Sequence, residues 1–194
     1  SENSFTKIVD DILKDACEYL GISAGALLRE NQEQKTVDMI CEYAGGGREP
    51  QMAKEQGVPK EELPFFNGKP YMISSDSMMP EGFARLFAQK NLTSAVFLPV
   101  EVNGHTSMYL CFCENEKKRK WEIADIKFIN DVKRIIQTIL TKRITKNSLA
   151  SSYASLEEIL ENVGCAIYVR DPQTGHILYA NEKYQKFFKK TLEE

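Results

Sequence analysis

Residues 93–140 read TSAVFLPVEVNGHTSMYLCFCENEKKRKWEIADIKFINDVKRIIQTIL, and this stretch decides the fold class. Two apolar runs flank Asn103-Gly104, a dipeptide typical of the tight turn between two antiparallel strands. A charged loop follows. From Ile123 onward, apolar residues recur every three or four positions, which is the period of an amphipathic helix. The stretch therefore predicts a β-hairpin followed by one long helix.

Helix and strand patterns also fill the residues before this stretch. Apolar residues at helical spacing predict a helix over 5–20, with Ser4 as its N-cap and Gly21 at its stop. Two strands are predicted next, over 23–30 and 36–44. Strict alternation in the second strand places four residues on one face: Val37, Met39, Cys41 and Tyr43.

A break in regular structure is expected over residues 44–70, which contain five glycines and four prolines. This irregular insert is followed by a short predicted strand at 70–74. A helix is then predicted from Pro80 to Gln89, with its aromatic side chains on one side. These elements lead into the hairpin.

Further elements are expected after the long helix, which is predicted over Ile123–Lys146. Residues 147–154 (NSLASSYA) predict a linker, and a short helix is expected over 156–162. Two strands joined at the turn 172–175 follow, and Asn181 is expected to cap a last helix. The predicted organisation is a domain over 1–146, the linker, and a second segment over 155–194.

Composition limits the classes of function. With 25 basic and 28 acidic residues, the net charge of −3 gives no field that would attract nucleic acid. No segment has the roughly 18 continuous apolar residues of a membrane span, so no membrane is expected in this fragment. Five cysteines and no secretory signal favour free thiols and a cytoplasmic location. Because the chain starts at Ser1, we expect a piece of a longer protein.

The order helix, two strands, insert, strand, helix, hairpin and long helix resembles a GAF domain over about residues 5–146. The hairpin SAVFLPVEVNGHTSMYLCF and the helix WEIADIKFINDVKRIIQTIL carry the resemblance. It implies an α+β fold, with an antiparallel sheet that has helices on one face. It also implies a pocket under the insert on the other face.

The tail LEEILENVGCAIYVRDPQTGHILYANEKYQKFF is similar to the beginning of a PAS domain, over about residues 155–194. Only the first part of such a domain is present, so a truncated PAS-like α/β fragment is expected. Bacterial proteins that run from GAF into PAS often end in GGDEF or EAL domains, or in a histidine kinase. The resemblance therefore implies a signalling parent protein with a downstream output domain.

The resemblance places a candidate pocket between the insert and the facing wall. Aromatic side chains with one arginine and one aspartate would suit a small planar or anionic ligand, whereas the plainer interpretation is that the aromatics fill core volume. The candidates are Tyr43, Arg48, Phe65, Phe66, Met72, Ser74, Asp76, Phe83 and Phe87. The cofactor stays unknown, since no haem, bilin or cyclic-nucleotide signature is found.

The cysteines leave several alternatives open. Cys111 and Cys113 fall on one face of a strand, and Cys41 was placed with them as a third thiol of the sheet. Such thiols are most often small apolar fillers. The alternatives are a reductase of free methionine sulfoxide that uses pocket cysteines, and thiols that sense or bind a metal. No zinc ligand set and no catalytic set are found, so no metal site and no enzyme activity are predicted for this fragment.

The predicted function is a small-molecule-sensing and dimerisation module that relays a signal through the long helix. A homodimer is expected along a seam with coiled-coil spacing: Ile129, Val132, Ile136 and Ile139. The competing interpretations are a core helix that is fully buried and a structural dimerisation domain that has lost its ligand.

Overall fold

The predicted hairpin is present in the computed structural model, which describes residues 2–46 and 57–193. Strands β5 (Ser94–Val102) and β6 (His105–Glu114) pair antiparallel. Asn103 has φ +53° and Gly104 has φ +77°, so both turn residues are left-handed. This geometry is required by the tightest hairpin turns and explains the Asn-Gly pair.

Six antiparallel strands form one sheet, in the order β3-β2-β1-β6-β5-β4. The other four strands are β1 (Ala24–Asn31), β2 (Thr36–Ala44), β3 (Val58–Pro59) and β4 (Tyr71–Ser74). The sheet confirms the α+β fold class predicted from the sequence. Its two central strands, β1 and β6, have core clusters on both faces.

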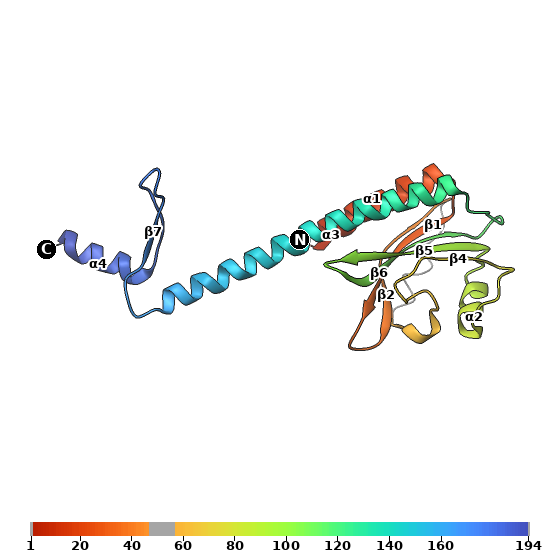
Figure 1. The fold of residues 1–194 in the computed structure, drawn as a ribbon, viewed down its shortest axis with the longest axis horizontal. Helices are drawn as coiled ribbons and strands as arrows, with labels where there is room; N and C mark the ends of the chain where they lie inside the picture. The colour runs from red at the N-terminus through yellow and green to blue at the C-terminus, as the bar shows by residue number, and fades with distance from the viewer. Residues whose placement is uncertain (1, 47–56, 194) are drawn as a thin grey trace. The chain divides into compact units, whose positions relative to one another are not determined.

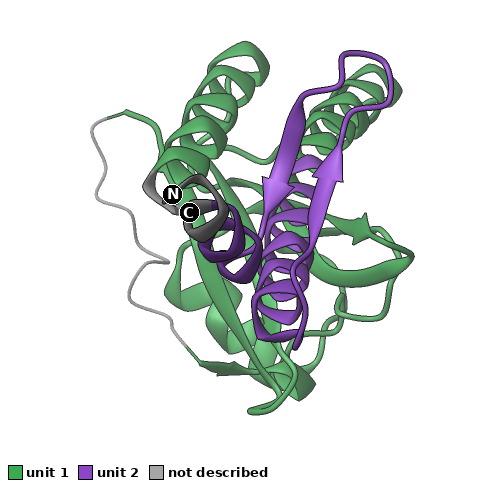
Figure 2. Cartoon of the chain, turned by 90° about the vertical axis from the view of Figure 1, so that its left-hand side faces the viewer, with its two compact units in different colours: residues 1–141 green, residues 142–194 purple. Residues whose placement is uncertain are grey.

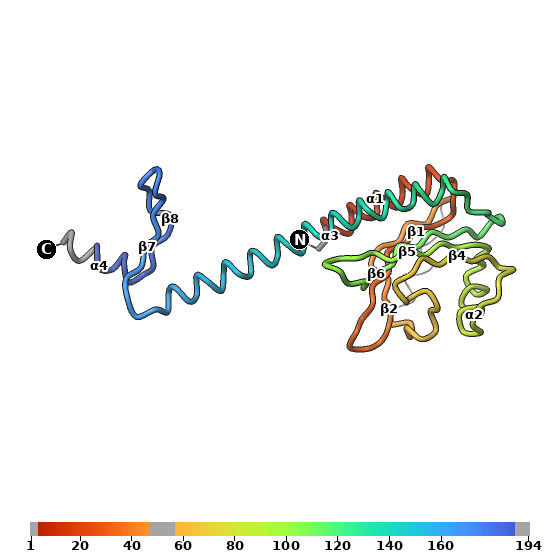
Figure 3. The backbone as a smooth tube through the Cα atoms, in the orientation of Figure 1, coloured from red at the N-terminus to blue at the C-terminus, as the bar shows by residue number. Residues whose placement is uncertain are grey.

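Two helices, α1 (Glu2–Leu20) and α3 (Ile123–Asn162), cover one face of this sheet. They lie side by side (Figures 1 and 3), and the rings of Tyr19 and Phe128 are 4.4 Å apart. We call this face the helix side. Helix α1 starts before the predicted N-cap at Ser4, but it stops as predicted at Gly21, whose φ is +63°.

The opposite face of the sheet, here called the insert side, is covered by residues 57–68 and by helix α2 (Glu81–Gln89). The described part of the insert contains only short elements, β3 and the 3₁₀ turn η2 (Lys60–Glu62). Helix α2 has the predicted start at Pro80-Glu81, and its buried residues are Phe83 and Phe87. The two faces therefore have separate apolar cores.

Strand β2 has an extra residue relative to β1. Leu27 pairs with Cys41 and Leu28 with Met39, so Ile40 has no partner in β1. This β-bulge breaks the alternation of faces. Met39 packs on the insert side, whereas Cys41 packs on the helix side. The predicted common face for Val37, Met39, Cys41 and Tyr43 is therefore wrong.

The charged loop after β6 is held by buried polar contacts. The Glu114 side chain accepts hydrogen bonds from the Ser23 hydroxyl and, at 3.0 Å each, from the backbone N–H groups of Asn115 and Glu116. Arg119 donates to the carbonyl oxygen of Leu20 at 2.7 Å and pairs with Asp125 at 3.1 Å. The loop thus joins the end of α1 to the start of α3.

The chain divides into unit 1 (residues 1–141) and unit 2 (residues 142–194), which Figure 2 shows in separate colours. The predicted helix break at 147–154 is wrong, because α3 continues through these residues without interruption. The segment contains neither glycine nor proline, so nothing in it stops a helix. Among the described residues, no helix is both long and apolar enough to cross a membrane.

Unit 2 contains the end of α3, the hairpin β7 (Tyr168–Arg170) and β8 (Ile177–Ala180), and helix α4 (Glu182–Glu193). Asn181 caps α4 as predicted: its Oδ1 accepts from the N–H of Tyr184 at 3.0 Å. The same side chain accepts from the N–H of Ile167 at 2.9 Å, and it donates to the carbonyl oxygens of Leu160 and Cys165 at 3.1 and 2.9 Å. One buried amide therefore joins the end of α3, the segment before β7 and the start of α4.

Candidate functional site

A small apolar cavity lies on the insert side of the sheet, with a volume of about 60 Å³. The sheet, the insert, helix α2 and the residues just after α2 all contribute to its walls. The lining residues are Leu28, Val37, Met39, Val58, Leu63, Phe65, Phe83, Leu86, Phe87, Lys90, Leu92, Phe97, Cys111 and Cys113. The predicted pocket region thus contains a small, partly open cavity.

The alternation of strand residues explains how the sheet contributes to this cavity. Phe97 of β5 and Cys111 of β6 face the insert side and are paired across the two strands. Leu110 and Phe112 face the helix side. Each central strand therefore has one row of side chains at the cavity and one row under the helices.

Aromatic rings occupy most of the space on the insert side. Phe65 stacks on Phe97 with ring centroids 3.8 Å apart, and Phe83 lies 5.8 Å from Phe65. Pockets that bind organic ligands usually have about 300–1,000 Å³. The remaining 60 Å³ is well below that range, so an organic ligand of ordinary size requires these rings to move.

Tyr109 fixes the end of the insert to the sheet. Its ring packs 4.5 Å from that of Phe66, and its hydroxyl accepts a hydrogen bond from the N–H of Gly68 at 2.6 Å. Burial raises the pKa of this phenol. The tyrosine therefore stays neutral near pH 7 and anchors the insert over the cavity.

Two cysteines face each other in the cavity wall. The Sγ atoms of Cys111 and Cys113 are 3.2 Å apart, and both side chains are buried. Burial, followed by the hydrogen bond with Cys113, raises the pKa of the Cys111 thiol well above its usual range. Near pH 7 Cys111 is therefore a neutral thiol and a weak nucleophile.

Cys41 does not join this pair, because the bulge in β2 directs it to the helix side. There, burial raises its pKa to about 12. The three thiols belong to one sheet, as the sequence indicated, but Cys41 lies on the opposite face from Cys111 and Cys113. Only Cys111 and Cys113 are left for the reductase or metal chemistry considered from the sequence.

Of the predicted pocket residues, Phe65, Phe83 and Phe87 line the cavity. Phe66 lies in the same apolar core but not in the cavity wall. The other aromatic candidate, Tyr43, is on the helix side, where its hydroxyl donates to Glu18 at 3.5 Å. Met72 is 58% exposed. Tyr43 and Met72 are therefore wrong as cavity residues, and Arg48 falls outside the described residues.

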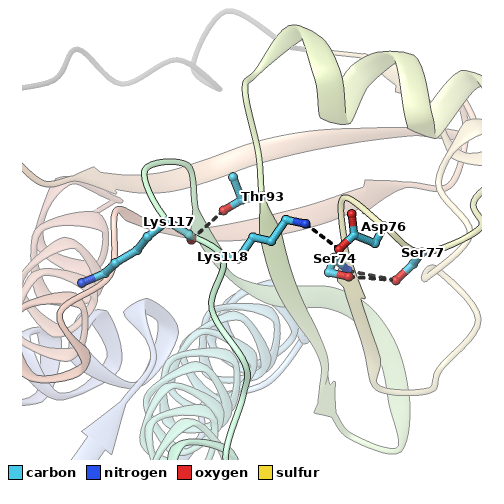
Figure 4. A network of polar contacts seen from close by, with 6 residues as sticks. All are labelled: Ser74, Asp76, Ser77, Thr93, Lys117 and Lys118. Atoms are coloured by element: carbon cyan, nitrogen blue, oxygen red, sulfur yellow. Dashed lines mark hydrogen bonds and ion pairs between the residues drawn. The ribbon is translucent and has the colours of Figure 1, made fainter.

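Ser74 and Asp76 also lie outside the cavity wall. Figure 4 shows them in an exposed polar network, where Asp76 pairs with Lys118 at 2.7 Å and Ser74 bonds to Ser77. Thr93 donates to the carbonyl oxygen of Lys117 at 2.8 Å in the same region. These contacts join the loop after β4 to the charged loop, and both residues are wrong as pocket residues.

The predicted dimer seam is wrong as well. Ile129, Val132 and Ile136 are buried in the helix-side core of their own chain, and Ile139 packs against that core. The spacing correctly indicated an apolar stripe. However, the partner of that stripe is the sheet with α1.

Lys90 is a cavity residue that sequence reasoning missed. It follows α2 directly, is only 8% exposed, and lines the cavity. Lysine is almost never buried to this extent without a functional or structural reason. The available sequence signal was its position directly after α2. The aromatic residues of that helix, Phe83 and Phe87, line the same cavity.

Comparison with solved structures identifies the architecture. The GAF domain of PixJ from Thermosynechococcus elongatus, in its blue-light absorbing form, superposes with a TM-score of 0.67 at 11% identity. The match covers 78% of this chain and 94% of that one. The chain has a GAF-like fold.

Two other solved structures are similar to this chain in fold. The phycoerythrobilin-bound GAF domain of a cyanobacterial phytochrome matches with a TM-score of 0.63 at 10% identity, over 74% of this chain and 89% of that one. A domain from a protein described as a two-component sensor histidine kinase, from Sinorhizobium meliloti, matches with a TM-score of 0.60 at 10% identity. That match covers 74% of this chain and 95% of the other. No family model matches the sequence, and no curated protein matches it.

Proposed function

We propose that residues 1–146 form a regulatory, non-enzymatic module that senses a small molecule and dimerises within a bacterial signal-transduction protein. Binding in the insert-side cavity shifts the population between two packing states of the sheet. The change is relayed through the part of α3 over Ile123–Lys146. The likeness to sensory GAF domains supports this role, since all the reported neighbours are sensor or photoreceptor domains.

One observation carries the proposal: adjacent residues of β6 contact the cavity and the helix-side core. Cys111 lines the cavity, while Phe112 lies in the core with α1 and α3. The packing at Phe112 is tight, because a Cβ added at Gly25 would lie 3.0 Å from its ring. Close-packed interiors transmit displacement. A ligand that moves Cys111 therefore moves the surface on which the helices rest.

The remaining parts of the proposal have separate support. Five free cysteines suit a reducing compartment, which favours the cytoplasm. In unit 2, exposed Tyr168, Ile177 and Phe187 form no buried apolar core. Such exposure is expected for the first part of a PAS domain over 155–194, followed in the parent protein by an output domain.

A thermal-shift screen with nucleotides, purines and tetrapyrroles tests ligand sensing. A ligand at a hundredfold excess over its Kd adds about 2.7 kcal/mol to the free energy of unfolding. For a domain of this size, the melting temperature should rise by about 5 to 10 °C. Leu86→Trp fills the cavity from α2 and should abolish the shift. Met72→Trp, at an exposed site, should retain it.

A ligand-free structural dimerisation domain is the second candidate function. The stacked rings of Phe65 and Phe97, which leave little free space, favour it. In that case no compound of the screen raises the melting temperature of the native chain, and Leu86→Trp alters only its baseline stability. That result would reject sensing of these classes of organic compound.

A further inference from the structure

We propose that Cys111 and Cys113 form a two-thiolate site for one soft monovalent metal ion of the copper(I) class, inside the insert-side cavity. This inference deepens the proposed function, on which it rests, by naming the class of ligand. Three features carry it: the geometry of the two sulfurs, the size and polarity of the cavity, and the position of Lys90.

The strand geometry favours a bridging ion over a disulfide. The cysteines are two residues apart on β6, so their Cα atoms are about 6.7 Å apart. This separation is at the upper limit for a disulfide, which also needs the Cβ atoms to approach to about 3.5–4.5 Å. Cβ atoms on one side of an extended strand stay farther apart. A disulfide would therefore distort a central strand that pairs with both β1 and β5.

A bridging ion needs only side-chain rotation. Metal–thiolate bonds of about 2.3 Å separate the two sulfurs by up to about 4.6 Å in a linear arrangement. The present Sγ–Sγ distance is 3.2 Å, and the side chains can open by rotation about χ1 while the strand stays in place. The two sulfurs therefore already lie within the span of one bridging ion.

Cavity size and ligand number select the kind of ion. A cavity of about 60 Å³ accepts a dehydrated ion but not an organic ligand of ordinary size. Thiolates select soft metals, whereas magnesium and calcium require several oxygen ligands. Structural zinc takes four ligands, and the described residues contain no group of three or more histidine, cysteine, aspartate or glutamate side chains that could hold a metal. Two sulfurs alone suit copper(I).

Lys90 offsets the charge of the complex. Copper(I) bound by two thiolates has a net charge of −1, which is costly in an apolar cavity. One basic residue, Lys90, is part of the cavity wall and is only 8% exposed. Binding breaks two S–H bonds, forms two S–Cu bonds and releases two protons to the solvent, with no change of oxidation state.

The test is a competition for copper(I) between the full chain and a chromophoric copper(I) chelator under anaerobic conditions. The wild-type chain should withdraw one equivalent of copper from the chelator. The variant Cys17→Ala/Cys41→Ala/Cys165→Ala keeps only the proposed pair and should still withdraw one equivalent. Cys111→Ala and Cys113→Ala should each withdraw none, with folding checked by circular dichroism.

The charge of Lys90 gives a second readout. Lys90→Met should weaken copper retention about tenfold, as is usual when a partner outside the direct ligands is lost. Lys90→Arg keeps the charge and should retain copper. Withdrawal of copper by the double variant Cys111→Ala/Cys113→Ala, or no withdrawal by the wild-type chain, overturns the proposal.

The relay is measured separately, by hydrogen exchange of residues 123–141 with and without copper(I). Altered exchange supports a copper-driven relay. Copper retention with unchanged exchange keeps the metal site and rejects that relay. No copper retention, together with a thermal shift by an organic compound, rejects the metal site and keeps the sensory role.

Discussion

At the scale of single residues, Gly25 shows a close approach that the sequence did not reveal. It is in β1, opposite α1, where an added Cβ would lie 3.0 Å from the ring of Phe112 and 3.1 Å from Cys17 Sγ. Its φ is not left-handed, so the glycine is needed for space and not for backbone freedom. A strand pattern alone does not show which helix lies above a given residue.

Gly25→Ala should therefore lower the free energy of unfolding by about 1–3 kcal/mol, the usual cost of overpacking a core. Urea denaturation monitored by tryptophan fluorescence measures this change. Gly164→Ala is the matched control, because no atom lies within 4 Å of the Cβ it would add. Equal stabilities for the two variants would show that the contact at Gly25 relaxes freely.

Asn181 marks the limit of prediction for a single side chain. The sequence indicated its role as a helix cap, because asparagine before a helical segment accepts the first free N–H groups. Its bonds to Leu160 and Cys165 join segments whose approach depends on the whole of unit 2. Local sequence shows the short-range bond and not the long-range ones.

At the scale of elements, the sequence predicted what local chemistry determines. The β5–β6 hairpin has its predicted ends because Asn103 and Gly104 both tolerate a left-handed backbone. The continuation of α3 through 147–154 was missed because polar composition was taken as a linker, although nothing there breaks a helix. The bulge at Ile40 was missed because the residues of β2 alternate in the sequence without a break that would mark an extra residue.

The side chain of Glu161 joins the end of α3 to the start of α4, and this contact should weaken at acidic pH. Its carboxylate accepts from the N–H of Glu182 at 2.9 Å and from the hydroxyl of Tyr179 at 2.6 Å. The N–H of Glu182, and then Tyr179, lower the pKa of Glu161. The same hydrogen bond raises the pKa of Tyr179 to about 12.

Because the folded pKa of Glu161 lies below the unfolded one, its contribution to stability is complete above the unfolded value of about 4.3. The contribution is lost as the pH falls through the folded pKa. An NMR pH titration should show the chemical shift of the Glu182 amide changing as the pH falls through the folded pKa of Glu161. Glu161→Gln should remove this change. A midpoint at or above the usual glutamate value would contradict the contact.

At the scale of the whole molecule, the two units differ in how they bury apolar side chains. Unit 1 has a core on each face of its sheet, whereas the described residues of unit 2 contain no buried apolar cluster. A two-stranded sheet with exposed apolar residues is marginally stable alone. The resemblance to the beginning of a PAS domain implies an incomplete sheet in this unit.

The exposed apolar residues of unit 2 indicate a different dimer seam from the one predicted from the sequence. On α3, Leu149, Tyr153 and Leu156 are spaced four and three apart, and they are 68%, 64% and 52% exposed. This is coiled-coil spacing with no partner among the described residues. We propose that these residues, in place of those of the predicted seam, meet a second copy of the chain.

Leu149→Asp/Leu156→Asp should convert the dimer to a folded monomer, because four charges would be buried in the new seam. Light scattering at micromolar concentration measures the mass. Ser151→Asp, on the opposite side of α3, should leave the dimer intact. In contrast, Ile136→Asp should unfold unit 1, since Ile136 is fully buried there. A dimer that survives the double substitution would reject this seam.

The unpaired Ile40 also affects how this chain is compared with its relatives. Removing that one position would restore one-to-one pairing along the ladder, with Cys41 still opposite Leu27 and Met39 still opposite Leu28. Every other side chain of the strand would keep its orientation. An alignment to a relative with a regular strand here therefore needs a one-residue gap at position 40, and an ungapped alignment exchanges inward and outward positions on one side of it.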